Sequence, residues 1–520
     1  MKIEIYDTTL RDGAQRVGIS FSVSDKLKIA QKLAELGFDF IEGGWSGSNP
    51  KDSEFFQKVK NLNLGKTIVC DFTMTCKKGV EPEKDPNFLT VLKSGTKVVT
   101  VFGKSWDLQV EKVLNATLKE NLSLIRKSCQ FFSSKGKRIF YDAEHFFDGF
   151  KSNSNYALET LKAAVKGGAE RIILCDTNGG SMPWEVAEIV REVKRKISVP
   201  LGIHAHNDGG MAVANTLTAV KEGVVQVQGT VNGYGERCGN ADLIQVIPNL
   251  QLKMGFDCLS KEKLRLLTEI SRYVAEIANL NPDPFQPFVG SNAFSHKAGV
   301  HADAILKWKN SYQHIDPVLV GNYPEITISE LSGKANILAK AKKFGFFLSP
   351  EEGRKIAKKI KKLEKEGFQF EGAETSFELF LRRSQPNYRA PFKLLNLKVV
   401  VENQDSKIVS RAQVKLKVKD KTVQTLAEGK GPVNALDKAL RKAILPFYPK
   451  LKEVRLSDYK VRILDSKKGT AAKVRVLIEF SDGKGKTWNT VGSSSNIVEA
   501  SWQALVDSYE YFVFRSSKIC

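Results

Sequence analysis

Two short motifs, far apart in the chain, contain residue types that bind divalent metal ions. Arg11 and Asp12 follow a short apolar strand near the N-terminus, and His204 and His206 stand at the end of another predicted strand. Alternate residues of a strand share one face, so both imidazoles are expected to point the same way. With Asp12 as an anionic ligand, they predict a catalytic metal site. The alternatives are a hydrogen-bonded histidine pair in the core and a simple Arg11–Asp12 salt bridge.

The elements that must position these motifs alternate regularly from residue 3 to about residue 252. The first helix is expected to begin after Ser24, to bury a stripe that includes Ala30 and Leu33, and to end at Gly37. Eight strand-then-helix units in about 250 residues predict an α/β fold, a (β/α)8 TIM barrel, whose chemistry lies at the carboxyl ends of the strands. An open doubly wound sheet is the alternative, but no Gly-x-Gly-x-x-Gly loop follows the first strand. The expected strands begin near Ile3, Phe38, Thr67, Lys97, Arg138, Arg171, Leu201 and Val224.

The remainder of the chain divides into two further regions. Residues 256–388 are expected to form a linker with accessory helical subdomains, after a barrel over residues 1–255. Residues 389–520 contain a repeat, because the run at Thr422 matches the run at Thr487 and the downstream Ala and Leu positions match at the same offset of 65 residues. This repeat predicts a C-terminal α+β domain built from two ββα-type units.

The formal net charge of +22 raises nucleic-acid binding as a rival function. Most of the excess Lys lies on predicted helix faces and strand alternations, and no helix-turn-helix, zinc-finger or RNA-binding aromatic signature is found. A solvated basic surface is therefore favoured, with no nucleic-acid partner.

Cysteine usage and hydropathy limit the class of protein. The seven cysteines are scattered and odd in number, so reduced thiols are expected rather than a disulfide framework. No apolar run approaches the roughly 20 residues that span a bilayer, so no membrane segment is expected. Strand-forming sequence begins within a few residues of Met1, which leaves no room for a signal peptide, and we expect a cytoplasmic protein.

Five motifs at predicted strand ends together resemble one enzyme family. This combination is similar to the α-isopropylmalate, homocitrate and citramalate synthase family of metal-dependent barrels. The resemblance extends over nearly the whole chain, because His296 to His301 and the duplicated region are similar to that family's accessory and regulatory parts. The motifs are Asp7 to Gly13, Asp142 to His145, Asp176-Thr177, His204 to Asp208 and Gly233 to Ala241.

The resemblance implies a metal-dependent Claisen-type condensation of acetyl-CoA with a 2-oxo acid, followed by hydrolysis that releases CoA. It implies that Asp12, His204, His206 and Asn240 bind the metal, which could be Zn, Mn or Mg. Two imidazoles, a carboxylate and an amide oxygen leave positions open for substrate. Retro-aldol or lyase chemistry on the same barrel is the alternative.

Other residues acquire roles from the same resemblance. Arg11 is expected to stabilise the charge that develops on the keto oxygen, and Thr177 to bind the substrate carboxylate. Glu144 is a candidate for proton transfer, or else a barrel-lining carboxylate paired with Arg11. His301 and Tyr312 resemble accessory residues that act on acetyl-CoA or on the hydrolytic water.

The runs that contain Glu42, Trp45, Phe102, Trp106 and Tyr141 look most like the branch of the family that uses pyruvate. Glu42 and Tyr141 are expected to contact the substrate, and the aromatic residues would reduce the pocket to the size of a methyl group. Aromatic residues at such positions can also be ordinary core. The alternative substrates are 2-oxoisovalerate and 2-oxoglutarate.

The duplicated region offers Gly- and Ser-rich turns immediately before two predicted helices. Gly429, Gly431, Ser494 and Asn496 are expected to present backbone N–H groups that suit a carboxylate. The resemblance implies that isoleucine binds there as a feedback effector in a homodimer. The alternative is a domain that only dimerises the chain.

Overall fold

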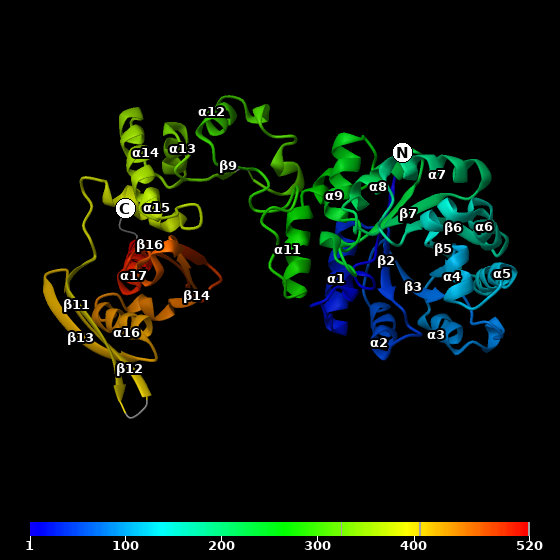
Figure 1. Cartoon of the computed structure of the whole chain (residues 1–520), viewed down its shortest axis with the longest axis horizontal. Coiled ribbons are helices and arrows are strands. Elements are labelled where there is room, and N and C mark those ends of the chain that lie inside the picture. The colour runs from blue at the N-terminus through cyan, green and yellow to red at the C-terminus, as the bar shows by residue number, and fades with distance from the viewer. Residues whose placement is uncertain (324, 405–406, 518–520) are drawn as a thin grey trace. The chain divides into compact units, whose positions relative to one another are not determined.

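The computed structural model describes residues 1–323, 325–404 and 407–517 (Figure 1). The chain divides into two compact units, each of which is described by itself. The first contains Met1–Phe294 and Ile315–Tyr323, and the second contains Ser295–His314 and Pro324–Cys520.

The first unit is built on a closed barrel of eight parallel strands in the order β1 to β8. β1 closes the barrel by pairing with both β2 and β8. The predicted (β/α)8 barrel is confirmed, and every expected strand begins within about two residues of an observed one because each apolar run has clear polar boundaries. The strands are β1 Glu4–Asp7, β2 Phe40–Gly44, β3 Ile68–Met74, β4 Val98–Lys104, β5 Arg138–Glu144, β6 Ala169–Asp176, β7 Leu201–Ala205 and β8 Gln226–Gly229.

A helix follows each strand, and the helices pack on the outer face of the barrel. Side chains of the helices and of the outward-facing strand residues form one apolar core. Residues inside the barrel form a second cluster that includes Tyr6, Phe40 and Phe140. The helices of this unit are α1 Val23–Leu36, α2 Pro50–Val59, α3 Pro86–Ser94, α4 Asp107–Lys112, α5 Leu118–Ser134, α6 Phe146–Lys166, α7 Pro183–Lys196, α8 Ala212–Lys221, α9 Leu243–Pro248, α10 Lys261–Leu264 and α11 Leu267–Ile277.

The start of α1 differs from the prediction. Ser22, not Ser24, is the N-cap, because its side chain accepts from the Asp25 N–H while Asp25 bonds back to the Ser22 N–H. This reciprocal pair satisfies two N–H groups that the first turn leaves open. Ala30, Leu33 and the left-handed Gly37 have the predicted places in the helix.

The second unit begins with short elements and helices. Ile337, Ala341, Ile356, Ile360 and Phe377 form a small core between the longer helices. The elements are β9 Ser295–His296, α12 Gly299–Lys307, β10 Glu325–Ile326, α13 Lys334–Lys343, α14 Pro350–Lys365 and α15 Glu374–Arg383.

The C-terminal part of this unit contains the predicted repeat, but each copy has three strands rather than two. Each copy is an antiparallel three-stranded sheet followed by a helix. The sequence match covered only the last strand and the helix of each copy, so the number of strands before that helix was underestimated. The copies are β11 Phe392–Gln404, β12 Lys407–Val418, β13 Lys421–Gly429 and α16 Pro432–Ile444, then β14 Arg455–Ile463, β15 Val474–Ser481, β16 Thr487–Ser494 and α17 Ile497–Ser517.

The two copies bury matching residues in one core. Ala439 and Leu440 of α16 and Ala504 and Leu505 of α17 are fully buried there. The 65-residue offset therefore corresponds to a structural pseudo-repeat.

The described residues contain neither a disulfide nor a helix suited to cross a membrane. Their six cysteines are free thiols. None of their helices combines the length and the apolar character that crossing a membrane requires.

Candidate functional site

A cavity of about 250 Å³ lies at the carboxyl ends of the barrel strands. Parallel strands direct their last side chains to this end of the barrel, so residues from most of the strands converge there. The lining residues are Arg11, Asp12, Gln15, Trp45, Phe72, Phe102, Asp142, Glu144, Cys175, Thr177, His204, His206, Glu236 and Arg237.

Asp12, His204 and His206 form a buried group in this cavity. One ligand atom from each lies within 4.8 Å of the others, and the arrangement is the only such His, Cys, Asp or Glu group found in the described part of the chain. The His204 Nε2 to Asp12 Oδ2 distance is 3.1 Å, and the two imidazole centroids are 5.2 Å apart. The three predicted ligands are therefore brought together by β1 and β7.

Asn240 completes this group from the loop after β8. Its Nδ2 lies 2.9 Å from Asp12 Oδ2 and 3.0 Å from His204 Nε2. Among the described residues, no partner bonds its buried Oδ1 or the buried His206 Nδ1. Buried polar atoms are rarely left unpaired. Rotation of the amide by 180° would turn its oxygen toward the carboxylate and imidazole, so two imidazoles, a carboxylate and an amide oxygen fit a divalent cation.

Gln228 of β8 orients the His204 imidazole through the ring nitrogen that faces away from Asp12. Its Oε1 lies 2.9 Å from His204 Nδ1 and its Nε2 lies 3.3 Å from Asp142 Oδ1. Since the amide oxygen can only accept, Nδ1 carries the proton and Nε2 is directed to the cavity. Asp142 belongs to one of the five motifs at predicted strand ends, whereas no motif in the sequence includes Gln228.

The local charges have opposite effects on the ligands. Burial raises the pKa of Asp12, but Arg11 and His204 outweigh burial, so this pKa lies well below its usual value. Burial lowers the pKa of His204, but the hydrogen bond that its ring donates to Asp12 and the charge of Asp12 raise this pKa above its usual value. Burial and the charge of His204 lower the pKa of His206 to about 4. The site therefore keeps Asp12 anionic and His206 neutral near neutral pH.

Arg11 is held over the cavity by two neighbours. Its Nε forms an ion pair with Glu42, and its guanidinium lies 4.0 Å from the centroid of the Phe72 ring. Glu42 also accepts a 2.7 Å hydrogen bond from the Tyr6 hydroxyl. Asp12 Oδ1 is 3.6 Å from Arg11 Nη1, so the salt bridge considered from the sequence is also present. Glu42 thus fixes Arg11 and does not line the cavity, unlike its expected role as a substrate contact.

Glu144 and Thr177 also line the cavity. Glu144 Oε2 is 2.6 Å from Lys104 Nζ. The ion pair of Glu144 is therefore with Lys104, whereas the alternative assignment expected a pair with Arg11. The Thr177 hydroxyl accepts a 2.8 Å hydrogen bond from the His145 backbone N–H. Its own proton is therefore available to an acceptor in the cavity.

Aromatic side chains form one wall. The Phe72 and Phe102 rings stack with centroids 4.9 Å apart, and Trp45 meets both edge-on at 6.2 and 5.8 Å. Two other expected pocket residues lie elsewhere. Tyr141 is fully buried in the core on the helix side of β5, because alternate residues of that strand face opposite ways. Trp106 does not line the cavity and contacts the His145 ring at 5.7 Å.

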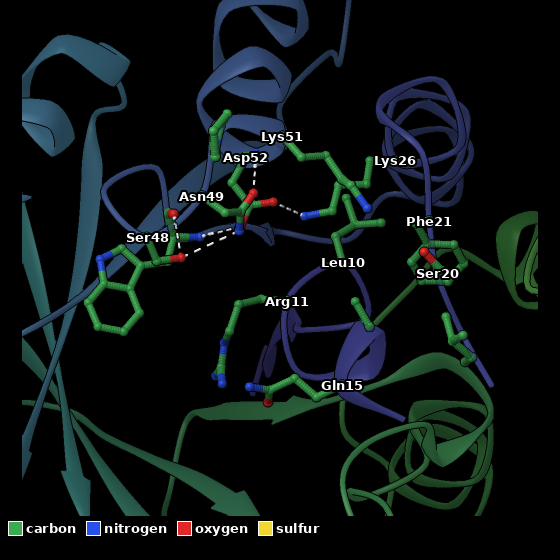
Figure 2. Close-up of a pocket in the computed structure, with 14 residues that line it drawn as sticks. Leu10, Arg11, Gln15, Ser20, Phe21, Lys26, Ser48, Asn49, Lys51 and Asp52 are labelled. Carbon is green, nitrogen blue, oxygen red and sulfur yellow. Dashed lines mark hydrogen bonds and ion pairs between the residues drawn. The ribbon is translucent and has the colours of Figure 1, made fainter. Parts of the chain in front are cut away.

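A second cavity, of about 550 Å³, adjoins the first and shares Arg11, Gln15 and Trp45 with it. Figure 2 shows Arg11 and Gln15 on one side of this cavity and Asn49 and Lys51 on another. The start of α2 forms part of the wall, with Asn49 as its N-cap.

Asp52 ties this wall together. It accepts from the Trp45 N–H at 3.0 Å and from the Asn49 amide at 2.8 Å. It also forms a buried ion pair with Lys26 (Figure 2). No sequence motif indicated this second cavity, because its wall combines the segment after β1 with the start of α2.

The remaining predicted residues belong to the second unit. His301 and Tyr312 stack there with ring centroids 4.2 Å apart. Gly431 is the N-cap of α16, and Gly429 is the last residue of β13.

The turn before α17 is partly closed by its own side chains. Asn496 Oδ1 accepts from the Val498 N–H at 2.9 Å, and the Ser494 hydroxyl donates to Glu499 at 2.5 Å. The N–H group of Val498 is therefore not free, contrary to the expectation for that turn.

Three family models match successive parts of the chain. Residues 2–274 match the family described as HMGL-like, residues 288–367 match the homocitrate synthase post-HMGL domain-like family, and residues 371–513 match the LeuA allosteric (dimerisation) domain.

Curated relatives align from end to end. The chain is 51% identical to an (R)-citramalate synthase of Geobacter sulfurreducens, over 99% of this chain and 98% of the relative. It is 49% identical to an (R)-citramalate synthase of Aquifex aeolicus, over 99% of each chain. Identity to a 2-isopropylmalate synthase of Methanocaldococcus jannaschii is 30%, over 99% of this chain and 96% of the relative.

Proposed function

The chain belongs to the (R)-citramalate synthase family, and from this premise we propose that it condenses acetyl-CoA with pyruvate and water to give (R)-citramalate and CoA. The observation that carries the proposal is the buried Asp12, His204 and His206 group beside the fixed guanidinium of Arg11. Such a reaction requires a keto group that is polarised and an acyl methyl group that loses a proton.

Asp12, His204, His206 and Asn240 would hold a divalent metal, with Zn, Mn and Mg as the candidates. When bound, this ion supplies Lewis-acid polarisation of the 2-oxo acid. Arg11 stabilises negative charge on the former keto oxygen. The ion pair with Glu42 keeps the guanidinium in position.

Thr177 and Glu144 act on the same substrate. The Thr177 hydroxyl donates to the substrate carboxylate, while one of its two lone pairs accepts from the His145 N–H. Glu144 is the candidate for proton transfer, and Lys104 keeps its carboxylate in place. For His301 and Tyr312 we retain the role implied by the family, in acetyl-CoA activation or in the hydrolysis.

Acetyl-CoA would enter through the cavity of Figure 2. That cavity joins the metal-type site through Arg11, Gln15 and Trp45, and the Lys51 side chain and the N-terminus of α2 offer positive charge to a phosphate. The smaller cavity favours pyruvate, because Trp45, Phe72 and Phe102 fill the wall that a branched 2-oxo acid would need.

The regulatory part of the proposal rests on the family of residues 371–513. We propose a homodimer with isoleucine as the effector, bound at the turns that contain Gly429, Gly431, Ser494 and Asn496. A cytoplasmic location stays a prediction from the sequence.

The test is release of the CoA thiol from acetyl-CoA with a panel of 2-oxo acids. The proposal requires the highest kcat/KM with pyruvate and loss of turnover on chelation, with recovery on adding a divalent metal. A higher kcat/KM with 2-oxoisovalerate would favour isopropylmalate synthesis, the activity named for the relative at 30% identity. Turnover that is indifferent to exhaustive chelation would contradict the metal assignment.

A further inference from the structure

The second unit contains a cavity of about 690 Å³ that the proposed function does not use. Segments from several elements surround it: the end of α15, residues 385–391, the β12–β13 turn, the loop after α16 and the last turns of α17. Five aromatic side chains contribute to its wall, namely Phe346, Tyr388, Phe447, Tyr448 and Phe514.

The charge of the lining is one-sided. Arg382, Arg389 and Lys419 line the cavity, and none of its lining residues is acidic. Within the described ranges, Arg389 and Lys419 form no ion pair. Two carboxylates contact lining residues from outside: Glu378 Oε1 lies 3.3 Å from Arg382 Nη2, and Glu510 accepts from the Tyr388 hydroxyl at 2.8 Å.

Arg382 has a donor that is not used. Its Nε is buried, and no described residue accepts a hydrogen bond from it. The guanidinium is held between two rings, 5.0 Å from the Phe514 centroid and 5.5 Å from the Phe346 centroid. Buried donors are nearly always paired, so a fixed arginine with a free Nε is suited to an acceptor that arrives from outside the chain.

Lys419 lines the same cavity from the turn between β12 and β13. It has a φ of 53°, a left-handed conformation that non-glycine residues seldom adopt. Its Nζ lies 5.9 Å from the Tyr448 ring centroid, and the Tyr448 hydroxyl donates to the Pro391 carbonyl at 3.0 Å. The Arg382 guanidinium and the aromatic wall are thus held in place by their own contacts, which reduces the entropy lost on binding.

We propose that this cavity binds a small organic carboxylate with an aromatic or branched apolar body and no ammonium group. The cations suit the carboxylate and the rings suit the body. An α-amino acid is disfavoured because its ammonium group would enter a positively charged cavity with no lining carboxylate to pair with. The site is therefore distinct in chemistry from an amino-acid effector site.

The test uses the full-length chain without divalent metal. Binding of 3-(4-fluorophenyl)propanoate is followed by 19F NMR line broadening, and unlabelled 3-phenylpropanoate and phenylalanine are the competitors. The probe has no keto group, so it cannot chelate a metal as a 2-oxo acid would. We expect saturable binding, displacement by phenylpropanoate and at least tenfold weaker displacement by phenylalanine.

Two lysine variants then locate the site. Lys419→Gln should weaken binding of the probe at least fivefold, whereas Lys421→Gln, an equal charge change two residues along at an exposed position outside the lining, should change it less than twofold. Arg382→Lys keeps the charge but removes Nε and should also weaken binding. Absence of saturable binding, equal displacement by phenylalanine, or equal effects of the two lysine variants would overturn the proposal.

Discussion

At the scale of single residues, the metal-type group is the first to test. Asp12→Ala or His206→Ala removes a ligand whose side chain faces a cavity, so each should abolish metal binding and reduce CoA release to background. Thermal unfolding of the metal-free variants should stay close to that of the wild type, because little apolar packing is lost. Calorimetric metal titration and the CoA assay measure these effects. Metal affinity that survives in both variants would show that the cation binds elsewhere.

Proton linkage gives a second prediction at this site. In the metal-free chain the pKa of His204 is raised, chiefly by Asp12 against the effect of burial, and burial lowers that of His206 to about 4. Between about pH 4.5 and 6.5, His204 therefore carries a proton and His206 does not. A metal ion needs both imidazoles neutral, so binding displaces one proton and the logarithm of affinity should rise with pH at a slope near one.

The measurement is metal affinity over this pH range, by competition with a chelator of known proton affinity. A slope near two would mean that His206 is also protonated, and a slope near zero that neither imidazole is. The sign is fixed by the direction of the His204 shift: affinity must fall as pH falls.

Arg11 supplies the third prediction. Arg11→Lys preserves the charge but cannot reproduce both the Glu42 ion pair and the 4.0 Å contact with the Phe72 ring. We expect kcat to fall about 10²- to 10³-fold, as when one transition-state donor is lost, with a smaller change in KM for pyruvate. The matched control is Arg16→Lys, since Arg16 lies 5.3 Å from the Tyr234 ring and outside the cavity. Equal losses in both variants would indicate a general effect on the barrel.

At the scale of elements, the first turn of α6 limits where β4 and β5 can present Lys104 and Glu144. A Cβ on Gly149 would lie 2.2 Å from the Ser105 carbonyl oxygen, which is backbone and cannot move aside easily. Gly149→Ala should therefore destabilise the chain by about 1–3 kcal/mol despite the higher helix propensity of Ala, and should lower kcat. Gly180→Ala is the control, because a Cβ there would meet no atom within 4 Å.

Urea unfolding measures both glycine variants. A Gly149→Ala chain as stable as the wild type would show that α6 can shift without cost, and the inference that this helix positions Glu144 would fail.

The sequence predicts elements better than the contacts between them. Eight strands were found because each is a continuous apolar run, and Asp12, His204 and His206 because they stand at strand ends. Phe72, Lys104 and Gln228 were missed, since their roles depend on which strands become neighbours in the closed barrel. Tyr141 was expected to face the cavity, but alternate residues of β5 face opposite ways and Tyr141 points to the helices. Strands were expected from about Phe392, but the number of strands in each repeat was underestimated, because the match between the repeats covers only β13 and β16 and the helices that follow them.

At the scale of the whole molecule, the metal-type site belongs to the first compact unit and the duplicated domain belongs to the second. The first unit is nearly balanced in charge, and most of the excess Lys and Arg belongs to residues 295–520. β14 in the second unit also leaves Leu456, Val461 and Ile463 between 41% and 59% exposed. An apolar strand face of this kind is suited to another protein surface, which is consistent with the proposed dimer.

A chain that ends after Tyr323 separates these properties. It keeps every residue of the first unit, including Asn322, whose amide donates to the Phe288 and Gly290 carbonyls at 3.0 and 2.9 Å. We expect it to fold, to bind divalent metal with the affinity of the full chain, to be monomeric by light scattering and to turn over more slowly. Residual activity should be insensitive to isoleucine, because an effector regulates only through a site that distinguishes two states. Equal inhibition of both chains by isoleucine would place the effector in the first unit, and a dimeric truncated chain would contradict dimerisation through the duplicated domain.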